Sequence, residues 1–318
     1  MINVGVDLGG TKIEAIALGP TGLELARQRV ATPDSYSACL GEIKGLVDRV
    51  LATARRHHPQ VGALGYTVGI GTPGTFDPGS GRMRNANTVW LNDREFRSDL
   101  ERVFDREVRI SNDANCLALS ETLDGAAEDA QTAFALILGT GCGGGLVSRK
   151  CLIEGHNGLA GEWGHIPLPW VDIADGTPPE CWCGKRGCIE TWVSGTGFSR
   201  DFAERGGRRL TAEAIIALAE DGDRLASECF EAFLSRLGRA LALIANIVDP
   251  DVFVFGGGLS NVGAIYQRLP EHIRAHVFGG QWEGKLLKAR HGDSSGVRGA
   301  ALLWRQGAPV TKSEIPAQ

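Results

Sequence analysis

The sequence predicts an α/β fold with substantial parallel strand pairing. Short apolar runs of the kind that form buried strands alternate with segments of helical periodicity, and glycine-rich turns follow several of these runs. We expect strands at residues 4–7, 13–18, 64–70, 108–111, 133–138, 146–148 and 252–255. A chain of 318 residues is long enough for two domains that each bury their own core.

Helix signals fill the gaps between these strands. The first predicted helix begins near Ser35, after Pro33, and its apolar residues recur every three or four positions. Further helices are expected from Asn115 to Gly125, over residues 228–248, and from near Val262. Residues 167–197 are rich in Pro, Trp, Gly and Cys, and they predict an irregular loop that a metal could organise.

Composition excludes several classes of protein. The net charge is −5, with 22% charged residues and no block of five or six like charges. This distribution argues against a nucleic-acid-binding surface, which needs clustered Lys and Arg. The N-terminus shows no basic region or cleavage site of a signal peptide, and the most apolar stretch, at 241–248, is too short to span a bilayer. We therefore expect a cytoplasmic protein without membrane or nucleic-acid partners.

Three glycine-rich turns follow predicted strands. Backbone N–H groups in such turns can hold a phosphate chain, because glycine lets the backbone approach it closely. An ordinary hairpin turn is the alternative for the first of them. The second turn lacks the following helix that a dinucleotide-binding turn requires. Together, the three turns indicate an actin-like nucleotide cleft between two lobes. They contain Asp7, Gly9, Gly10, Thr11 and Lys12; then Gly139, Thr140 and Gly141; then Gly256, Gly257 and Gly258.

Seven of the eight cysteines fall into two groups. Cys39, Cys116, Cys142 and Cys229 are scattered singly, as is usual for reduced packing residues in a cytosolic protein. By contrast, Cys181, Cys183 and Cys188 are clustered. Such a cluster favours a metal site, with unbound reduced thiols as the alternative.

Three motifs resemble the ROK family of sugar kinases and related repressors. Residues 7–12 resemble its N-terminal phosphate signature, residues 162–165 resemble its E-x-G-H motif, and residues 181–190 resemble its C-x-C-G-x-x-G-C-x-E motif. The resemblance covers nearly the whole chain. Within the family, the stretches 85–92, 161–170 and 291–300 are most similar to bacterial fructokinases of the manno(fructo)kinase type.

The resemblance implies a two-lobed, actin-like (ribonuclease H-like) ATPase fold with an interlobe cleft. Residues 1–115 and 297–318 would form a small lobe with the phosphate turn and a C-terminal helix packed back on it. Residues 116–296 would form a large lobe with the metal loop and the adenosine site. The resemblance also implies a homodimer.

The implied activity is transfer of phosphate from ATP, with Mg²⁺, to the 6-hydroxyl of D-fructose. Mannose, glucose and N-acetylglucosamine are alternative acceptors. A non-catalytic sugar sensor and a sugar-responsive repressor are alternatives from other classes. Family repressors carry a helix-turn-helix domain ahead of the phosphate turn, which here already begins at residue 7.

Asp113 is the implied catalytic base. It lies between a predicted strand and the helix near Asn115, so capping that helix is its structural alternative. For Glu162 and Glu190, the alternative is a solvated surface carboxylate. The implied sugar-binding residues are Gly74, Asn87, Asn112, Asp113, Glu162, His165 and Glu190.

His165, Cys181, Cys183 and Cys188 are the implied ligands of a structural Zn²⁺ ion. One His and three thiolates suit a closed tetrahedral site. One ring nitrogen of His165 would bind the metal and the other could contact the sugar. Residues 169–180 form an insert between His165 and Cys181, and no role is assigned to it.

Overall fold

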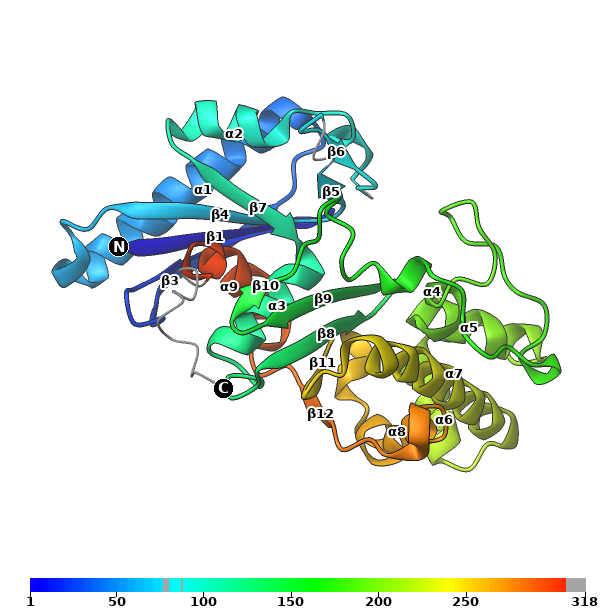
Figure 1. The fold of residues 1–318 in the computed structure, drawn as a ribbon. Coiled ribbons are helices and arrows are strands. Elements are labelled where there is room, and N and C mark those ends of the chain that lie inside the picture. Colours follow the sequence, from blue (N-terminus) through cyan, green and yellow to red (C-terminus); the bar gives the residue numbers. More distant parts are fainter. Residues whose placement is uncertain (77–79, 87, 307–318) are drawn as a thin grey trace. The chain divides into compact units, whose positions relative to one another are not determined.

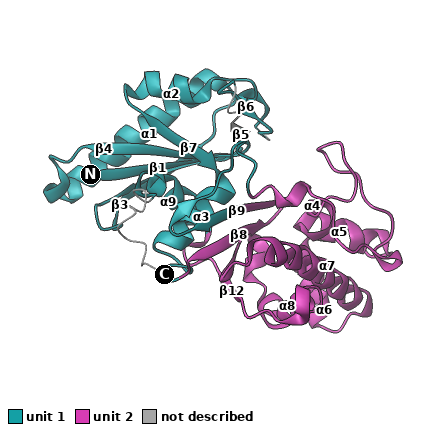
Figure 2. Cartoon of the chain, viewed as in Figure 1, with its two compact units in different colours: residues 1–129, 145–160, 293–318 teal, residues 130–144, 161–292 magenta. Residues whose placement is uncertain are grey.

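The computed structural model describes residues 1–76, 80–86 and 88–306. The chain has the predicted α/β, actin-like two-lobe class and divides into two compact units (Figure 2). Unit 1 comprises residues 1–129, 145–160 and the chain from residue 293 onward, and unit 2 comprises 130–144 and 161–292. None of the described helices is both long and apolar enough to cross a membrane.

Unit 1 contains a five-stranded sheet of order β3-β2-β1-β4-β7. The central strand β1 runs antiparallel to β2 and parallel to β4, which in turn runs parallel to β7. β1 and β4 are buried almost throughout, which explains their continuous apolar pattern. The strands are β1 (Ile2–Leu8), β2 (Lys12–Leu18), β3 (Glu24–Ala31), β4 (Tyr66–Thr72) and β7 (Val108–Asn112).

Helices cover this sheet on both sides (Figure 1). α1 (Tyr36–His57) packs on β2 and β3, whereas α9 (Ser295–Leu302) packs on β1, β4 and α3 (Asp113–Leu123). Glycines allow this close approach of α9. An added Cβ would lie 2.1 Å from the carbonyl oxygen of Val297 at Gly5, and 1.9 Å from that of Ala300 at Gly69. The last described α-helix, α9, thus packs on the first sheet of the chain.

The compact units group the chain differently from the expected lobe boundaries. α3 and residues 145–160 belong to unit 1, although a large lobe was expected to begin at residue 116. The physical reason is that α3 packs along α9, where Gly299 lies directly against the backbone of Cys116. The other elements of this unit and its margins are η1 (Pro59–Val61), β5 (Thr75–Phe76), β6 (Met83–Arg84), η2 (Val89–Leu91), α2 (Phe96–Phe104), β10 (Cys151–Leu152), η7 (Gly292–Ser294) and η8 (Leu303–Arg305).

The second five-stranded sheet has the order β10-β9-β8-β11-β12. β8 is its central strand, and β11 pairs in parallel with both β8 and β12. The predicted strands at 133–138, 146–148 and 252–255 are confirmed within β8, β9 and β11. The bounds are β8 (Thr132–Leu138), β9 (Cys142–Ser148), β11 (Val252–Gly256) and β12 (Lys285–Lys288).

The long helix α7 (Arg224–Val248) organises the helices of unit 2 and contacts α4, α5, α6 and α8. It starts four residues earlier than predicted, because the Asp223 side chain caps it by accepting a 2.8 Å hydrogen bond from the backbone N–H of Ala226. The other elements are α4 (Glu190–Val193), α5 (Gly195–Glu204), α6 (Ala212–Glu220), α8 (Gly263–Arg274), η3 (Trp163–His165), η4 (Ile173–Asp175), η5 (Gly258–Asn261) and η6 (Phe278–Gly280).

Buried ion pairs fasten the 169–180 insert to α7. Arg236 and Arg239, both buried, bind the Asp175 carboxylate at 3.0 and 2.7 Å, and Arg236 also binds Asp201 at 2.8 Å. Arg239 additionally donates to the carbonyl oxygen of Trp170 at 2.7 Å. Although burial opposes it, the hydrogen bonds from these arginines and from Asp172 lower the pKa of Asp175 to about 2. The insert, irregular as predicted, is therefore ordered by charge pairing.

Candidate functional site

The first glycine turn closes the β1–β2 hairpin in unit 1. The Gly9 N–H donates to the Lys12 carbonyl oxygen at 3.0 Å, and the Thr32 hydroxyl donates to the Gly9 carbonyl oxygen at 2.7 Å. Gly10, Thr11 and Lys12 are exposed at its tip. The turn therefore joins two antiparallel strands, with exposed polar side chains at its tip, and does not begin a helix.

Asp7 is the second-last residue of β1, close to this turn, and is half-buried. Desolvation, followed by the negative charges of Asp113 and Glu14, raises the pKa of Asp7 to about 6, although Lys12 partly opposes the rise. Grouped carboxylates that repel one another are suited to share a cation. Asp7 is therefore a candidate ligand for a divalent metal.

Asp113 is the first residue of α3, immediately after β7. The cap of α3 is Asn112, whose Oδ1 accepts a 2.6 Å hydrogen bond from the Asn115 N–H. Solvent reaches the Asp113 side chain, but the surrounding protein partly desolvates its carboxyl group and raises its pKa. One carboxyl oxygen accepts from the Ala114 N–H at 2.8 Å. Asn112 therefore caps α3, and Asp113 is a carboxylate with increased proton affinity.

A pocket of about 330 Å³ lies beside Asn112 in unit 1. Gly74 lines it with a φ of +86°, and an added Cβ there would lie 2.5 Å from the carbonyl oxygen of Arg84, so this tight turn requires glycine. Two of the predicted sugar-binding residues, Gly74 and Asn112, therefore line the same pocket. A third, Asn87, lies outside the described residues.

The four predicted metal ligands come together in unit 2. Their donor atoms all lie within 4.8 Å of one another. The Cys181 sulfur is 3.6 Å from Nδ1 of His165, and the Cys183 and Cys188 sulfurs are also 3.6 Å apart. A tetrahedral zinc site with bonds of about 2.3 Å to sulfur and about 2.0 Å to nitrogen needs S···S near 3.8 Å and S···N near 3.5 Å. The donor set fits zinc, and it identifies Nδ1 as the metal-facing nitrogen of His165.

Glu190 begins α4, two residues after the last of these cysteines, and is half-buried. Its Oε2 accepts from the Cys142 N–H at 2.9 Å, and its Oε1 accepts from the Trp182 indole N–H at 2.8 Å. An added Cβ at Gly141 would lie 2.8 Å from Oε2, so Gly141 makes room for this carboxylate. Glu162 lies at the start of η3, where its carbonyl oxygen accepts from the His165 N–H at 3.2 Å.

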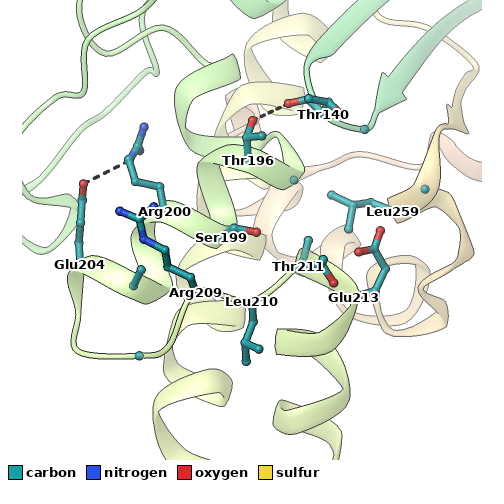
Figure 3. Close-up of a pocket in the computed structure, with 16 residues that line it drawn as sticks. Thr140, Thr196, Ser199, Arg200, Glu204, Arg209, Leu210, Thr211, Glu213 and Leu259 are labelled. Atoms are coloured by element: carbon teal, nitrogen blue, oxygen red, sulfur yellow. Dashed lines mark hydrogen bonds and ion pairs between the residues drawn. The ribbon is translucent and has the colours of Figure 1, made fainter. Parts of the chain in front are cut away.

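A larger pocket of about 1100 Å³ opens elsewhere in unit 2 (Figure 3). Gly139 and Thr140 from the second glycine turn line it together with Gly258 from the third. The α5 N-terminus meets the second turn there, because Gly195 donates to the Gly139 carbonyl oxygen at 2.7 Å and Thr196 to that of Thr140 at 2.5 Å. Gly256 and Gly257 are not among the lining residues. Gly257 instead packs its backbone against Leu138.

The lining of this pocket combines several chemistries. Arg200 and Arg209 supply positive charge, Glu213 supplies an acceptor, and Leu210 and Leu259 supply apolar surface (Figure 3). Glycine backbone and a helix N-terminus suit phosphate groups, and a carboxylate suits hydroxyls. The residues from α5 and α6 were missed from the sequence. Residues 195–197 repeat the Gly-Thr-Gly pattern of 139–141 and were the available signal.

The chain is similar to known proteins along nearly its whole length. The ROK family model matches residues 3–307. The N-acetyl-D-glucosamine kinase of Vibrio cholerae is 40% identical over 304 residues, which cover 94% of this chain and 98% of that protein. A ROK hexokinase structure from Thermus thermophilus has a TM-score of 0.82 and 31% identity, covering 95% and 97% of the two chains. A ROK family glucokinase from Streptomyces griseus, solved with glucose and AMPPNP, has a TM-score of 0.74 and 30% identity, covering 96% and 100%.

Proposed function

The chain belongs to the ROK family, and from that premise we propose that this sugar kinase transfers phosphate from ATP to the 6-hydroxyl of a free hexose. The observation that carries the proposal is the position of Asp113, exposed at the first residue of α3 with a raised pKa and within electrostatic reach of Asp7. Phosphoryl transfer needs little beyond a base, positioned reactants and compensation of charge.

Unit 1 would supply the base and the phosphate turn. Asp113 accepts the proton of the 6-hydroxyl as its oxygen attacks the γ-phosphorus, and ADP leaves with the electron pair of the broken P–O bond. Desolvation raises the pKa of the Asp113 carboxyl group, which strengthens it as a base. Asp7 would hold Mg²⁺, which offsets phosphate charge when bound. Gly9, Gly10, Thr11 and Lys12 would contact the phosphates.

Unit 2 would bind the nucleotide and part of the sugar. The pocket of about 1100 Å³ is large enough for a nucleoside triphosphate, and its glycine turn lies at the α5 N-terminus. Gly139 and Thr140 fit this assignment better than Gly141, which lies against Glu190. Glu162 and Glu190 would accept hydrogen bonds from sugar hydroxyls, and the Nε2–H of a metal-bound His165 would donate one to a sugar oxygen. Asn112 and Gly74 are further proposed sugar contacts.

Zinc would be structural. His165, Cys181, Cys183 and Cys188 have the spacing of a closed tetrahedral site, which leaves no position for substrate. Bound zinc would fix the His165 ring through Nδ1 and so orient its other nitrogen. The predicted cytoplasmic location and homodimer remain predictions.

N-acetyl-D-glucosamine is the acceptor that we propose first. Its support is the 40% identity to a kinase named for that sugar, over nearly the full length of both chains. D-fructose, the acceptor expected from the sequence, is the second candidate, and it rests on residues 85–92, 161–170 and 291–300. The comparisons therefore favour an acceptor that was predicted only as an alternative.

A coupled assay of ADP release over a panel of hexoses tests the proposal. We expect ATP-dependent turnover with N-acetyl-D-glucosamine to exceed that with D-fructose, D-mannose and D-glucose in kcat/KM. The highest value with D-fructose would assign the second candidate. Absence of ADP release with every sugar, from protein shown to be folded and zinc-loaded, would reject the kinase proposal.

A further inference from the structure

Trp182 has an unusual place in unit 2, between the two predicted metal ligands Cys181 and Cys183. Its side chain is 66% exposed, so core packing does not explain a residue of this size. Its indole N–H nevertheless donates to Oε1 of Glu190 at 2.8 Å, and its ring meets the His165 ring edge-on, with centroids 4.8 Å apart. Trp182 thus contacts two of the residues proposed to bind the sugar.

We propose that Trp182 is a positioning residue for the sugar, because it holds the Glu190 carboxylate in the orientation that accepts sugar hydroxyls. This inference rests on the proposed role of Glu190. Each carboxylate oxygen receives one donor, Oε1 from Trp182 and Oε2 from the Cys142 backbone, so neither can rotate freely.

The same hydrogen bonds leave Glu190 able to bind substrate. A carboxylate offers about four acceptor positions, and the two protein donors occupy two of them. Both donors are neutral, so Glu190 keeps its full charge for hydrogen bonds to hydroxyl groups, which are stronger than neutral ones. An arginine in place of Trp182 would compete with the sugar for this charge, whereas an indole only orients it.

Trp182 also links Glu190 to the metal loop. The backbone around it is held by short turn contacts, with Cys181 donating to Lys185 at 2.8 Å and Gly184 donating to Cys181 at 3.0 Å. Gly184 has a φ of +85°, a conformation that glycine adopts without strain. Bonds from Cys181 and Cys183 to a metal would restrain the segment further on both sides of Trp182. Metal binding would therefore order Glu190 through the indole.

The Trp182→Phe variant tests the proposal, because it keeps an aromatic ring beside His165 and removes the N–H donor. Trp170→Phe is the matched control, since Trp170 is also exposed (52%) in unit 2 and packs on His276 instead. Calorimetry with N-acetyl-D-glucosamine and with D-fructose should show about tenfold weaker sugar binding in Trp182→Phe, with zinc content, ATP affinity and kcat within about twofold of the native protein. Trp170→Phe should retain native sugar affinity.

Two further measurements separate positioning from a general structural effect. In a Glu190→Gln background, Trp182→Phe should add less than a twofold loss of sugar affinity, because the group that it positions has already been altered. Sugar should also change the intrinsic fluorescence of the native protein and of Trp170→Phe, and this change should fall by more than half in Trp182→Phe.

Sugar affinity within twofold of native in Trp182→Phe, an equal loss in Trp170→Phe, or full additivity with Glu190→Gln would each overturn the proposal. Its failure is distinguishable from failure of the proposed function. Sugar binding without ADP release would reject the kinase while still testing Trp182, and normal turnover with unaltered Trp182→Phe binding would reject only the positioning role.

Discussion

Replacing Gly141 with Ala should weaken sugar binding through a single steric contact. The added Cβ would lie 2.8 Å from Oε2 of Glu190, and an ordinary contact needs about 3.4 Å, so the carboxylate must retreat by about 0.6 Å. The hydrogen bond from Cys142, now 2.9 Å, then lengthens towards 3.5 Å and is lost. Gly141 has no left-handed φ, so the backbone itself accepts alanine.

The expected magnitude follows from that hydrogen bond. A hydrogen bond to a charged group contributes about 1.5–3 kcal/mol, which corresponds to a factor of roughly 10 to 150 in affinity. Steady-state kinetics at saturating ATP should therefore show a sugar KM at least about tenfold higher in Gly141→Ala. The ATP KM and the melting temperature should change little.

Gly139→Ala provides the matched control in the same turn. An added Cβ there meets no described atom within 4 Å, so the Glu190 carboxylate is undisturbed. Because Gly139 lines the larger pocket, any effect should fall on the ATP KM and not on the sugar KM. An unchanged sugar KM in folded Gly141→Ala would refute the assignment of Glu190 to the sugar.

Two further predictions concern the carboxylates of Asp7 and Asp175, whose pKa values are shifted in opposite directions. Asp7→Asn should raise the melting temperature by roughly 2–4 °C at pH 8 in metal-free buffer, because the raised pKa, about 6, makes ionisation of Asp7 costly in the folded state. Between about pH 4 and 6, Asp7 binds more protons in the folded than in the unfolded state, so the stability difference between Asp7→Asn and the native protein should vanish below about pH 4. A difference in melting temperature that does not change with pH would contradict this cause. Asp175→Asn should destabilise the protein by about 3–5 kcal/mol at pH 7 in urea titrations, since it leaves two buried arginines without their shared carboxylate. Because the pKa of Asp175 is lowered, its ion pairs stabilise the fold fully above about pH 4, and the stability deficit of Asp175→Asn should shrink as pH falls towards 2. A loss below about 1 kcal/mol at pH 7 would refute the stabilising role of these ion pairs.

The predicted strands were those whose burial imposes an apolar run. β1, β4 and β11 are buried almost throughout, so most of their residues are apolar or glycine and the pattern is local in sequence. By contrast, β3 alternates charged residues at the sheet edge, and β12 is a four-residue strand with exposed lysines. These two strands are defined by pairing with a neighbour, which the sequence does not display.

The residues of the candidate site also differ in how well the sequence predicts them. His165 and the three cysteines lie in a short segment with characteristic spacing, so their grouping could be predicted. Apart from the residues of the predicted glycine turns, most of the lining of the larger pocket comes from α5, α6 and the loop between them, which carry no motif beyond the Gly-Thr-Gly of residues 195–197. The hydrogen bond from Trp182 to Glu190 depends on how the metal loop folds back on α4, and residue types alone do not predict it.

Turnover by Asp113→Asn tests the central claim most directly, because the amide preserves the shape of the side chain and removes its ability to accept the proton. With N-acetyl-D-glucosamine, or D-fructose if the panel selects it, kcat should fall by about 10²–10⁴, while calorimetric sugar affinity stays within a few-fold of native. A kcat within tenfold of the native value would show that another group takes the proton and would contradict the proposed mechanism.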